Sequence, residues 1–66
     1  MEIFVQGERR IVPENCTVEM VLNLLELVPS MCLVEINGEV SPRNEWSRVF
    51  LKEGDRLEIF RVTAGG

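Results

Sequence analysis

Hydrophobic and polar residues alternate one by one in several short stretches of the chain, which is the period of a β-strand with one buried face. The first stretch, residues 2–6, places Ile3 and Val5 on one side and Phe4 on the other. Pro13 ends the second stretch, because proline cannot continue the hydrogen bonding of a strand. The alternation predicts strands at residues 2–6, 9–12, 32–37, 39–41 and 56–63.

A helical period replaces this alternation after Pro13. Thr17 is suited to cap a helix N-terminus, because its hydroxyl can accept a hydrogen bond from a free backbone N–H, and Glu19 complements the helix dipole. Pro29 is expected to end the helix at about Val28. The apolar stripe of this helix consists of Val18, Val21, Leu22 and Leu25, widened by Leu24 and Leu27.

Turns separate the strands of two hairpins. Gly7-Glu8 predicts a tight turn between the first two strands. Asn37-Gly38 favours a turn with positive φ between the third strand and a short fourth one. Both connections are short, so each pair of strands is expected to be antiparallel.

The elements follow the order strand, strand, helix, strand, short strand, strand. A hairpin followed by a helical crossover returns to the same sheet, so the helix stripe can cover one sheet face. Residues 42–48 are expected to be irregular or a single helical turn, anchored by Trp46. These features predict an α+β domain over residues 1–63, with a mixed sheet of four to five strands packed on one helix. The covered sheet face would contain Ile3, Val5, Ile11, Val34, Ile36, Leu57 and Ile59.

Composition restricts the chemistry of this domain. The 66 residues include no histidine, which removes histidine-based triads, histidine zinc sites and the usual general base near neutral pH. A free-standing enzyme is therefore not expected. The formal net charge of −4 argues against a general attraction to nucleic acid or to an anionic membrane. The chain has neither a membrane-length apolar run nor a basic leader, so a cytoplasmic location is expected.

The two cysteines, Cys16 and Cys32, are sixteen positions apart, which is the spacing of neither a disulfide framework nor a metal site. Cys16 falls at the predicted helix start, where a thiolate is favoured. A buried and chemically idle side chain is nevertheless the preferred interpretation of Cys16. Cys32 is expected to fill apolar space.

The end of the sequence, Gly65-Gly66, is its most informative feature. Glycine has no Cβ, so a backbone ending in two glycines can be threaded into a narrow active site that larger residues would block. Residues 64–66 are expected to form a flexible tail. A frayed chain end without function is the alternative interpretation.

Short motifs follow one another in a specific order along the chain. Each is a weak signal alone, but their succession and spacing in so short a chain are specific. They are the Gly7-Glu8 turn, Thr17-Val18 with Val21-Leu22-x-Leu24-Leu25, Val34-Glu35-Ile36-Asn37-Gly38-Glu39-Val40, Pro42-Arg43-x-x-Trp46, Leu51-x-x-Gly54-Asp55-Arg56-Leu57-Glu58-Ile59 and Gly65-Gly66.

With these motifs the chain resembles the ThiS family of sulfur carriers from thiamine biosynthesis, which are small ubiquitin-like proteins with a β-grasp fold. It departs from the family pattern at Gln6, where asparagine usually precedes the first turn glycine. The resemblance implies a carrier that binds no cofactor and supplies no catalytic side chain. An adenylating enzyme of the ubiquitin-activating type would use ATP to activate the carboxylate of Gly66. A persulfide donor would then supply sulfur to form a thiocarboxylate, and a thiazole synthase would take that sulfur. Gly65 would give the tail access to these active sites.

A docking patch is also expected. Phe4, Phe60 and Val62 point away from the helix-covered face by the period-two rule, and an exposed apolar patch on a small domain marks a partner surface. The alternative is that a loop or Trp46 folds over these side chains. Arg61 could pair with a partner carboxylate or with the adenylate, or it could be a solvated strand charge.

Other functions stay open at this point. The small subunit of molybdopterin synthase is a related carrier with the same tail, although the chain length and the Pro42-Arg43-x-x-Trp46 segment favour the thiamine carrier. A β-grasp binding module without a carrier role would be expected to have a basic face. A β-grasp ferredoxin is excluded, because its cluster needs four cysteines.

Overall fold

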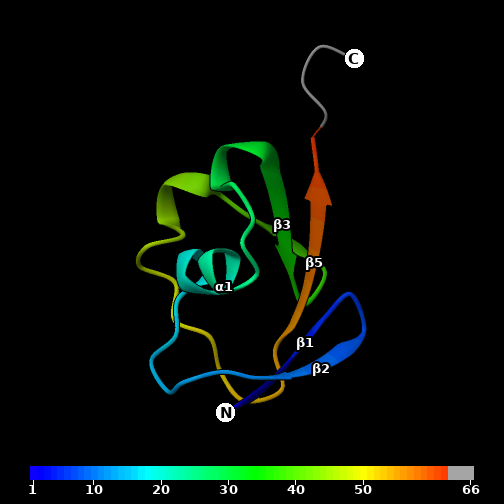
Figure 1. Cartoon of the computed structure of the whole chain (residues 1–66), viewed down its shortest axis with the longest axis vertical. Helices are drawn as coiled ribbons and strands as arrows, with labels where there is room; N and C mark the ends of the chain where they lie inside the picture. Colours follow the sequence, from blue (N-terminus) through cyan, green and yellow to red (C-terminus); the bar gives the residue numbers. More distant parts are fainter. Residues whose placement is uncertain (63–66) are drawn as a thin grey trace.

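One helix lies across one face of a five-stranded sheet in the computed structural model, which describes residues 1–62 (Figure 1). The expected two-layer α+β arrangement is confirmed. The helix is α1 (Val18–Leu24), and two short 3-10 helices are η1 (Pro29–Met31) and η2 (Arg43–Glu45). The strands are β1 (Glu2–Val5), β2 (Glu8–Ile11), β3 (Cys32–Ile36), β4 (Glu39–Ser41) and β5 (Arg56–Arg61).

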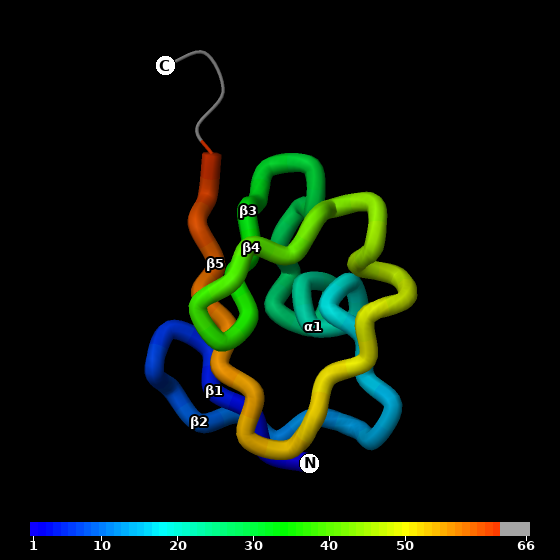
Figure 2. Tube along the Cα trace, turned by 180° about the vertical axis from the view of Figure 1, so that it is seen from behind, coloured from blue at the N-terminus to red at the C-terminus, as the bar shows by residue number. Residues whose placement is uncertain are grey.

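The sheet has the strand order β2-β1-β5-β3-β4. Among these described strands, β1 and β5 pair in parallel, whereas the other neighbours are antiparallel. The last strand therefore lies in the middle of the sheet, between the β1–β2 hairpin and the β3–β4 hairpin (Figure 2). A central strand that leads directly to the end of the chain is held on both sides, which fixes the direction in which it points.

The core lies between the sheet and α1. Thr17 caps the helix as predicted, since the backbone N–H of Met20 donates to its Oγ1 at 3.1 Å. Trp46 is also the anchor that the sequence predicted: it is only 2% exposed, and its indole N–H donates to the backbone oxygen of Ser41 at 2.8 Å. The most deeply buried apolar side chains are Ile3, Cys16, Val18, Val21, Leu22, Cys32, Val34 and Leu57.

The prediction that Ile11 belongs to this core is wrong. The first hairpin turns at Gln6 and Gly7, which both have positive φ, and not at Gly7-Glu8. This shift of one residue sets Ile3 opposite Arg10. Because successive side chains of a strand point to opposite faces, the shift exchanges the faces of the whole strand, and Ile11 is 68% exposed.

The prediction that the helix continues to Val28 is also wrong. The chain leaves the helix after Leu24, and Glu26 takes a left-handed conformation with φ of 60°. The N–H of Glu26 donates to the oxygen of Asn23 at 3.0 Å, and the N–H of Leu27 donates to that of Leu22 at 2.9 Å. These two bonds form a Schellman motif, which satisfies helix carbonyls and reverses the chain. Leu24, expected to widen the buried stripe, is 60% exposed, because it lies to one side of the stripe of Val18, Val21 and Leu22 around the helix axis.

Candidate docking face and tail base

The sheet face that α1 leaves uncovered carries an apolar cluster near the end of β5. Phe60 lies directly opposite Leu33 in the antiparallel pairing of β3 and β5, and the two side chains are 47% and 52% exposed. Val62 follows on the same face by strand alternation, is 45% exposed, and donates its backbone N–H to the oxygen of Met31 at 2.7 Å. We call Leu33, Phe60 and Val62 the open-face patch.

Phe4 lies on the same face but not in this patch. In the parallel pairing it is level with Arg56, four residues before Phe60 on β5, which corresponds to about 13 Å along the strand. The structure therefore brings Phe60 and Val62 together and leaves Phe4 apart. Trp46 is buried in the core and does not cover the patch. A role of these residues in docking stays a prediction.

The sequence interpretation missed Leu33. Alternation in β3 turns Cys32 and Val34 inward, so it also turns Leu33 outward, but no sequence signal shows which strand lies beside β5. The pairing of β3 with β5 supplies that information.

A pair of carboxylates borders the open-face patch. Glu35 lies directly opposite Glu58, one alternation step from Leu33 and Phe60 on the same face. Like charges at directly opposite positions repel each other, and a cation between them relieves the repulsion. Arg56 lies on the same face of β5 and lines a hollow together with Glu58, so one cation stands against the two carboxylates. The remaining excess of negative charge beside an apolar cluster suits a partner surface that is apolar and basic.

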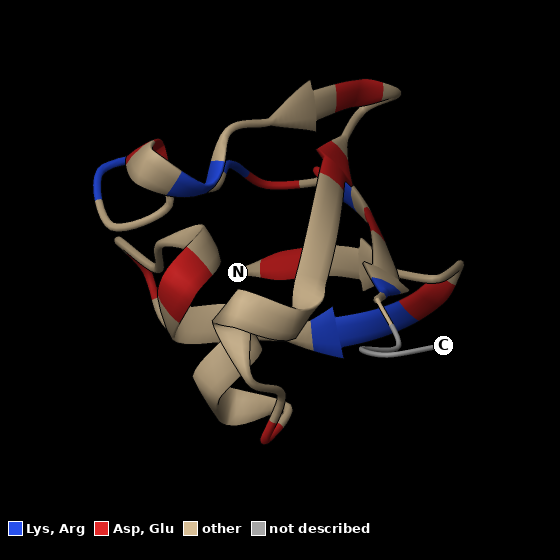
Figure 3. Ribbon diagram, turned by 90° about the horizontal axis from the view of Figure 1, so that it is seen from above, with Lys and Arg blue, Asp and Glu red and all other residues tan. Residues whose placement is uncertain are grey.

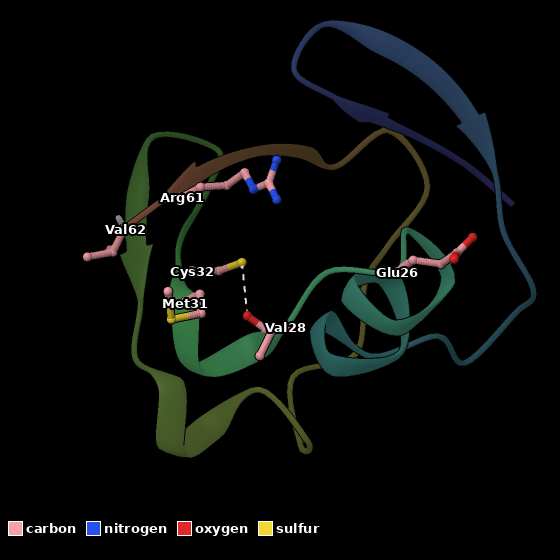
Figure 4. Close-up of a pocket in the computed structure, with 6 residues that line it drawn as sticks. All are labelled: Glu26, Val28, Met31, Cys32, Arg61 and Val62. Carbon is pink, nitrogen blue, oxygen red and sulfur yellow. Dashed lines mark hydrogen bonds between the residues drawn. The ribbon is translucent and has the colours of Figure 1, made fainter. Parts of the chain in front are cut away.

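Arg61 belongs to the opposite side of β5. Its side chain extends over a pocket of about 450 Å³ between the end of β5 and the segment that follows α1, whereas Val62 extends in another direction (Figure 4). Cys32 borders this pocket and its thiol donates to the backbone oxygen of Val28 at 3.4 Å. Arg61 therefore lies at the base of the tail but away from the open-face patch.

Both cysteines are buried and free, as predicted. Burial raises the pKa of the Cys16 thiol, while the nearby charge of the N-terminal amino group opposes this with a smaller lowering effect. The thiol is therefore kept in its less reactive, protonated form, although it lies at the start of α1. Among residues 1–62, no three His, Cys, Asp or Glu side chains are grouped so that they could hold a metal ion.

Two side chains fix β5 from its two neighbouring hairpins. Gln6 donates from Nε2 to the backbone oxygen of Ile59 at 2.7 Å and accepts the N–H of Ile59 on Oε1 at 3.0 Å. Asn37 accepts the N–H of Arg56 at 3.0 Å and donates to Asp55 Oδ1 at 3.1 Å. Both residues begin a two-residue turn and have φ of 52°. Gln6, the departure from the family pattern, thus attaches the first hairpin to β5.

Gly66, the predicted covalent site, and Gly65, predicted to give access, lie outside the described residues. The last described strand, β5, points away from the body of the molecule (Figure 1). The chemistry proposed for them consequently rests on the sequence and on comparison with other proteins.

Comparison with known proteins identifies the family. The profile of the ThiS family matches residues 1–66, the full length of the sequence. The chain belongs to the ThiS family. A crystal structure of the thiamine biosynthesis protein ThiS from Geobacter metallireducens is 30% identical, covers all of both chains and superposes with a TM-score of 0.85. A solution structure from the same organism gives a TM-score of 0.81 over all of this chain and 88% of the other. These matches confirm the ubiquitin-like β-grasp fold.

Two curated relatives extend the comparison. The sulfur carrier protein ThiS of Escherichia coli is 32% identical over 50 residues, which are 76% of each protein. A thiazole synthase of Paramagnetospirillum magneticum is 33% identical over the whole of this chain, but the chain spans only 20% of the length of that protein. In the part of this ThiS-family chain that the structure describes, no helix has the length and apolar character to cross a membrane.

Proposed function

We propose that this chain is a sulfur carrier of thiamine biosynthesis and that the carboxylate of Gly66 carries the sulfur. The observation that supports the proposal most strongly is the match of the ThiS family to the entire sequence, Gly65 and Gly66 included. The names of the relatives agree with it, since one is a sulfur carrier protein and another a thiamine biosynthesis protein.

The chemistry needs activation because a carboxylate is a poor electrophile. In the proposed cycle, an adenylating enzyme joins the Gly66 carboxylate to AMP from ATP and releases pyrophosphate. The terminal sulfur of a persulfide then attacks the activated carbon, and AMP leaves. Cleavage of the remaining sulfur–sulfur bond by a partner thiol leaves a thiocarboxylate on the carrier and a disulfide on the partner. The carrier supplies no side chain to these steps, which agrees with a chain that has no histidine.

Recognition is the task that remains for the folded domain. Leu33 and Phe60 offer an apolar contact beside the base of the tail, and the carboxylates of Glu35 and Glu58 adjoin them. We propose that the adenylating enzyme docks on this open-face patch through an apolar and basic surface. Docking there would place the residues beyond β5 at a defined distance from the partner's active site.

A thiazole synthase is the proposed acceptor of the sulfur. The support for it is that a protein of that name contains a segment similar to this entire chain. An association of carrier and synthase in one protein favours a direct transfer between them, because tethering raises the effective concentration of one for the other.

Genetic complementation tests the proposal. A strain that lacks its own ThiS should grow without thiamine when it expresses this chain, and should not grow when the chain lacks Gly65 and Gly66. A strain that lacks the small subunit of molybdopterin synthase is the matched control and should not be rescued. Rescue of the second strain alone would assign the chain to molybdopterin synthesis, and rescue by the shortened chain would exclude a role of the Gly66 carboxylate.

A further inference from the structure

The strand β2 forms an edge of the sheet, and within residues 1–62 no strand pairs with its outer side. All four of its residues are exposed. Met1 and Val12 exchange two hydrogen bonds across the hairpin, at 2.6 and 2.8 Å. Because hydrogen-bonded and non-hydrogen-bonded pairs alternate in an antiparallel ladder, Arg9 and Ile11 direct their N–H and C=O groups outward, away from β1.

A groove follows this edge between β2 and α1. Two adjoining hollows of about 160 and 250 Å³ share Val5, Arg10 and Leu25 in their walls. Ile11 and Leu24, which are 68% and 60% exposed, line the first hollow. Both of these residues were expected in the core, and both are instead at the surface: Leu24 lies on α1, and the side chain of Ile11 points to the opposite face of β2. The groove therefore offers apolar contacts directly beside the free edge.

The charge of this edge is opposite to that of the whole chain. The formal net charge is −4, yet Arg9 and Arg10 are consecutive on β2, where Figure 3 shows a continuous stretch of basic residues. Arg61 lines the second hollow. Arg9 pairs with Glu2. Within residues 1–62, no carboxylate lies within 4 Å of the guanidinium of Arg10 or of Arg61. Glu8 also lines the second hollow, so two cations and one carboxylate border the groove, and the balance of charge there is positive.

We propose that the β2 edge and this groove bind an extended, acidic and aliphatic peptide segment of a partner protein, which adds to the sheet as a strand next to β2. The outward backbone groups of Arg9 and Ile11 would pair with the peptide backbone, as in other cases of strand addition. On the face of the peptide that turns toward α1, aliphatic side chains would contact Leu24 and Leu25, and carboxylates would pair with Arg10 and Arg61. On its other face, an aliphatic side chain would contact Ile11.

The same charges disfavour a second copy of this chain as the occupant. Antiparallel pairing of two β2 edges about their common centre would place Arg10 opposite Arg10 of the other copy, and like charges at opposite positions are destabilising. The β2 edge is separated from the open-face patch by β1 and β5. A segment bound at β2 would therefore leave the patch free for another partner.

A selection experiment with the isolated chain tests this site. The 66-residue protein is immobilised and used to select from a random peptide library displayed on phage. We expect the selected peptides to be rich in Asp, Glu and branched aliphatic residues. A chosen peptide is then synthesised, and its dissociation constant is measured by fluorescence anisotropy at low and high salt. Binding should weaken at high salt, because exposed charges are screened.

Variants locate the binding. Arg10→Glu should weaken binding by at least about tenfold, since it replaces an attraction by a repulsion, whereas the control Arg48→Glu, an exposed arginine outside the groove, should have little effect. Ile11→Pro removes an outward N–H without removing a bond to β1, and it should also weaken binding. Amide chemical shifts establish that each variant keeps the fold.

Several results would overturn the proposal. These are a selection without peptides specific for this chain, equal affinity of Arg10→Glu and the wild type, or shift changes centred on Leu33 and Phe60. A molar mass that rises with concentration and falls in Ile11→Pro would assign the edge to a second copy of the chain. None of these measurements uses ATP, sulfur or an adenylating enzyme, so they are independent of the proposed carrier function.

Discussion

The side-chain amide of Gln6 binds the backbone of Ile59 at both its N–H and its carbonyl oxygen, with distances of 3.0 and 2.7 Å. β1 itself ends at Val5, so this side chain takes the place that a further strand residue would occupy beside β5. Ile59 directly precedes Phe60 and lies two residues before Arg61. The Gln6 amide therefore supports the part of β5 that presents the open-face patch and leads to the tail.

Removal of this amide should loosen the end of β5. We expect Gln6→Ala to lower the free energy of unfolding by about 1–3 kcal/mol, since two hydrogen bonds are lost and each contributes about 0.5–1.5 kcal/mol. Urea denaturation measures the change, and Glu8→Ala, an exposed position in the same hairpin, is the control. Equal stability of the two variants would show that the Gln6 amide does not support β5.

Charge at the centre of the open-face patch should impair docking and spare the fold. Phe60→Glu is expected to weaken binding to the adenylating enzyme by at least about tenfold, which corresponds to about 1.4 kcal/mol. The domain should stay folded, because Phe60 is already 47% exposed. Titration calorimetry measures the affinity, and circular dichroism measures the melting temperature.

The matched control for this experiment is Phe50→Glu. Phe50 is a phenylalanine of similar exposure, 58%, and it pairs with Thr17 at the start of α1, not with β5. We expect this variant to bind the adenylating enzyme normally. Unfolding of Phe60→Glu would instead show that Phe60 belongs to the core. Equal loss of affinity in both variants would contradict docking of the adenylating enzyme on the open-face patch.

The left-handed residue after α1 offers a stabilising substitution. A residue with a Cβ pays about 1–2 kcal/mol in this conformation, whereas glycine has about 0.5–1 kcal/mol more backbone entropy to lose on folding. Glu26→Gly should therefore raise the unfolding free energy by about 0.5–1 kcal/mol. Glu19→Gly, inside the helix, should lower it by about 1 kcal/mol. Destabilisation by both substitutions in urea denaturation would contradict the Schellman geometry of Glu26.

The buried thiol of Cys16 predicts a stability loss at alkaline pH. Its folded-state pKa is raised from the ordinary value of 9.0 by burial, so the unfolded chain loses this proton at a lower pH than the folded one. The stabilising contribution is complete below the unfolded-state pKa and is lost as the pH rises through the folded-state pKa. The unfolding free energy of the wild type should thus fall more steeply above pH 9 than that of Cys16→Ala. Parallel curves would contradict this assignment.

Local patterns predicted the elements of the fold but not their exact relation to one another. The alternation around Ile3 and the helical stripe around Val21 each arise within a single element that packs against the core. Such a pattern can be recognised from the sequence of that element alone. The face of Ile11 depends on where the hairpin turns. Gln6 can adopt positive φ there because the turn brings its amide to Ile59, which is a tertiary contact that no local pattern contains.

For the candidate docking face, too, local patterns predicted one part, and contacts between distant strands decided the rest. Alternation in β5 correctly placed Phe60 and Val62 on the uncovered face, and it placed Phe4 there as well. Only the register of β1 with β5 separates Phe4 from them, and only the pairing of β3 with β5 adds Leu33. Contacts across strands distant in sequence are the information that a single sequence does not carry.

The most direct test of the carrier proposal is the intact mass of the protein after incubation with an adenylating enzyme, ATP and a persulfide sulfur donor. The account predicts that the mass rises by the difference between one sulfur and one oxygen atom, and that fragmentation places the gain on Gly66. A chain without Gly66 should show no gain. An unchanged mass under conditions in which the Escherichia coli sulfur carrier protein is converted, or a gain located on Cys16 or Cys32, would contradict the proposal that the terminal carboxylate carries the sulfur.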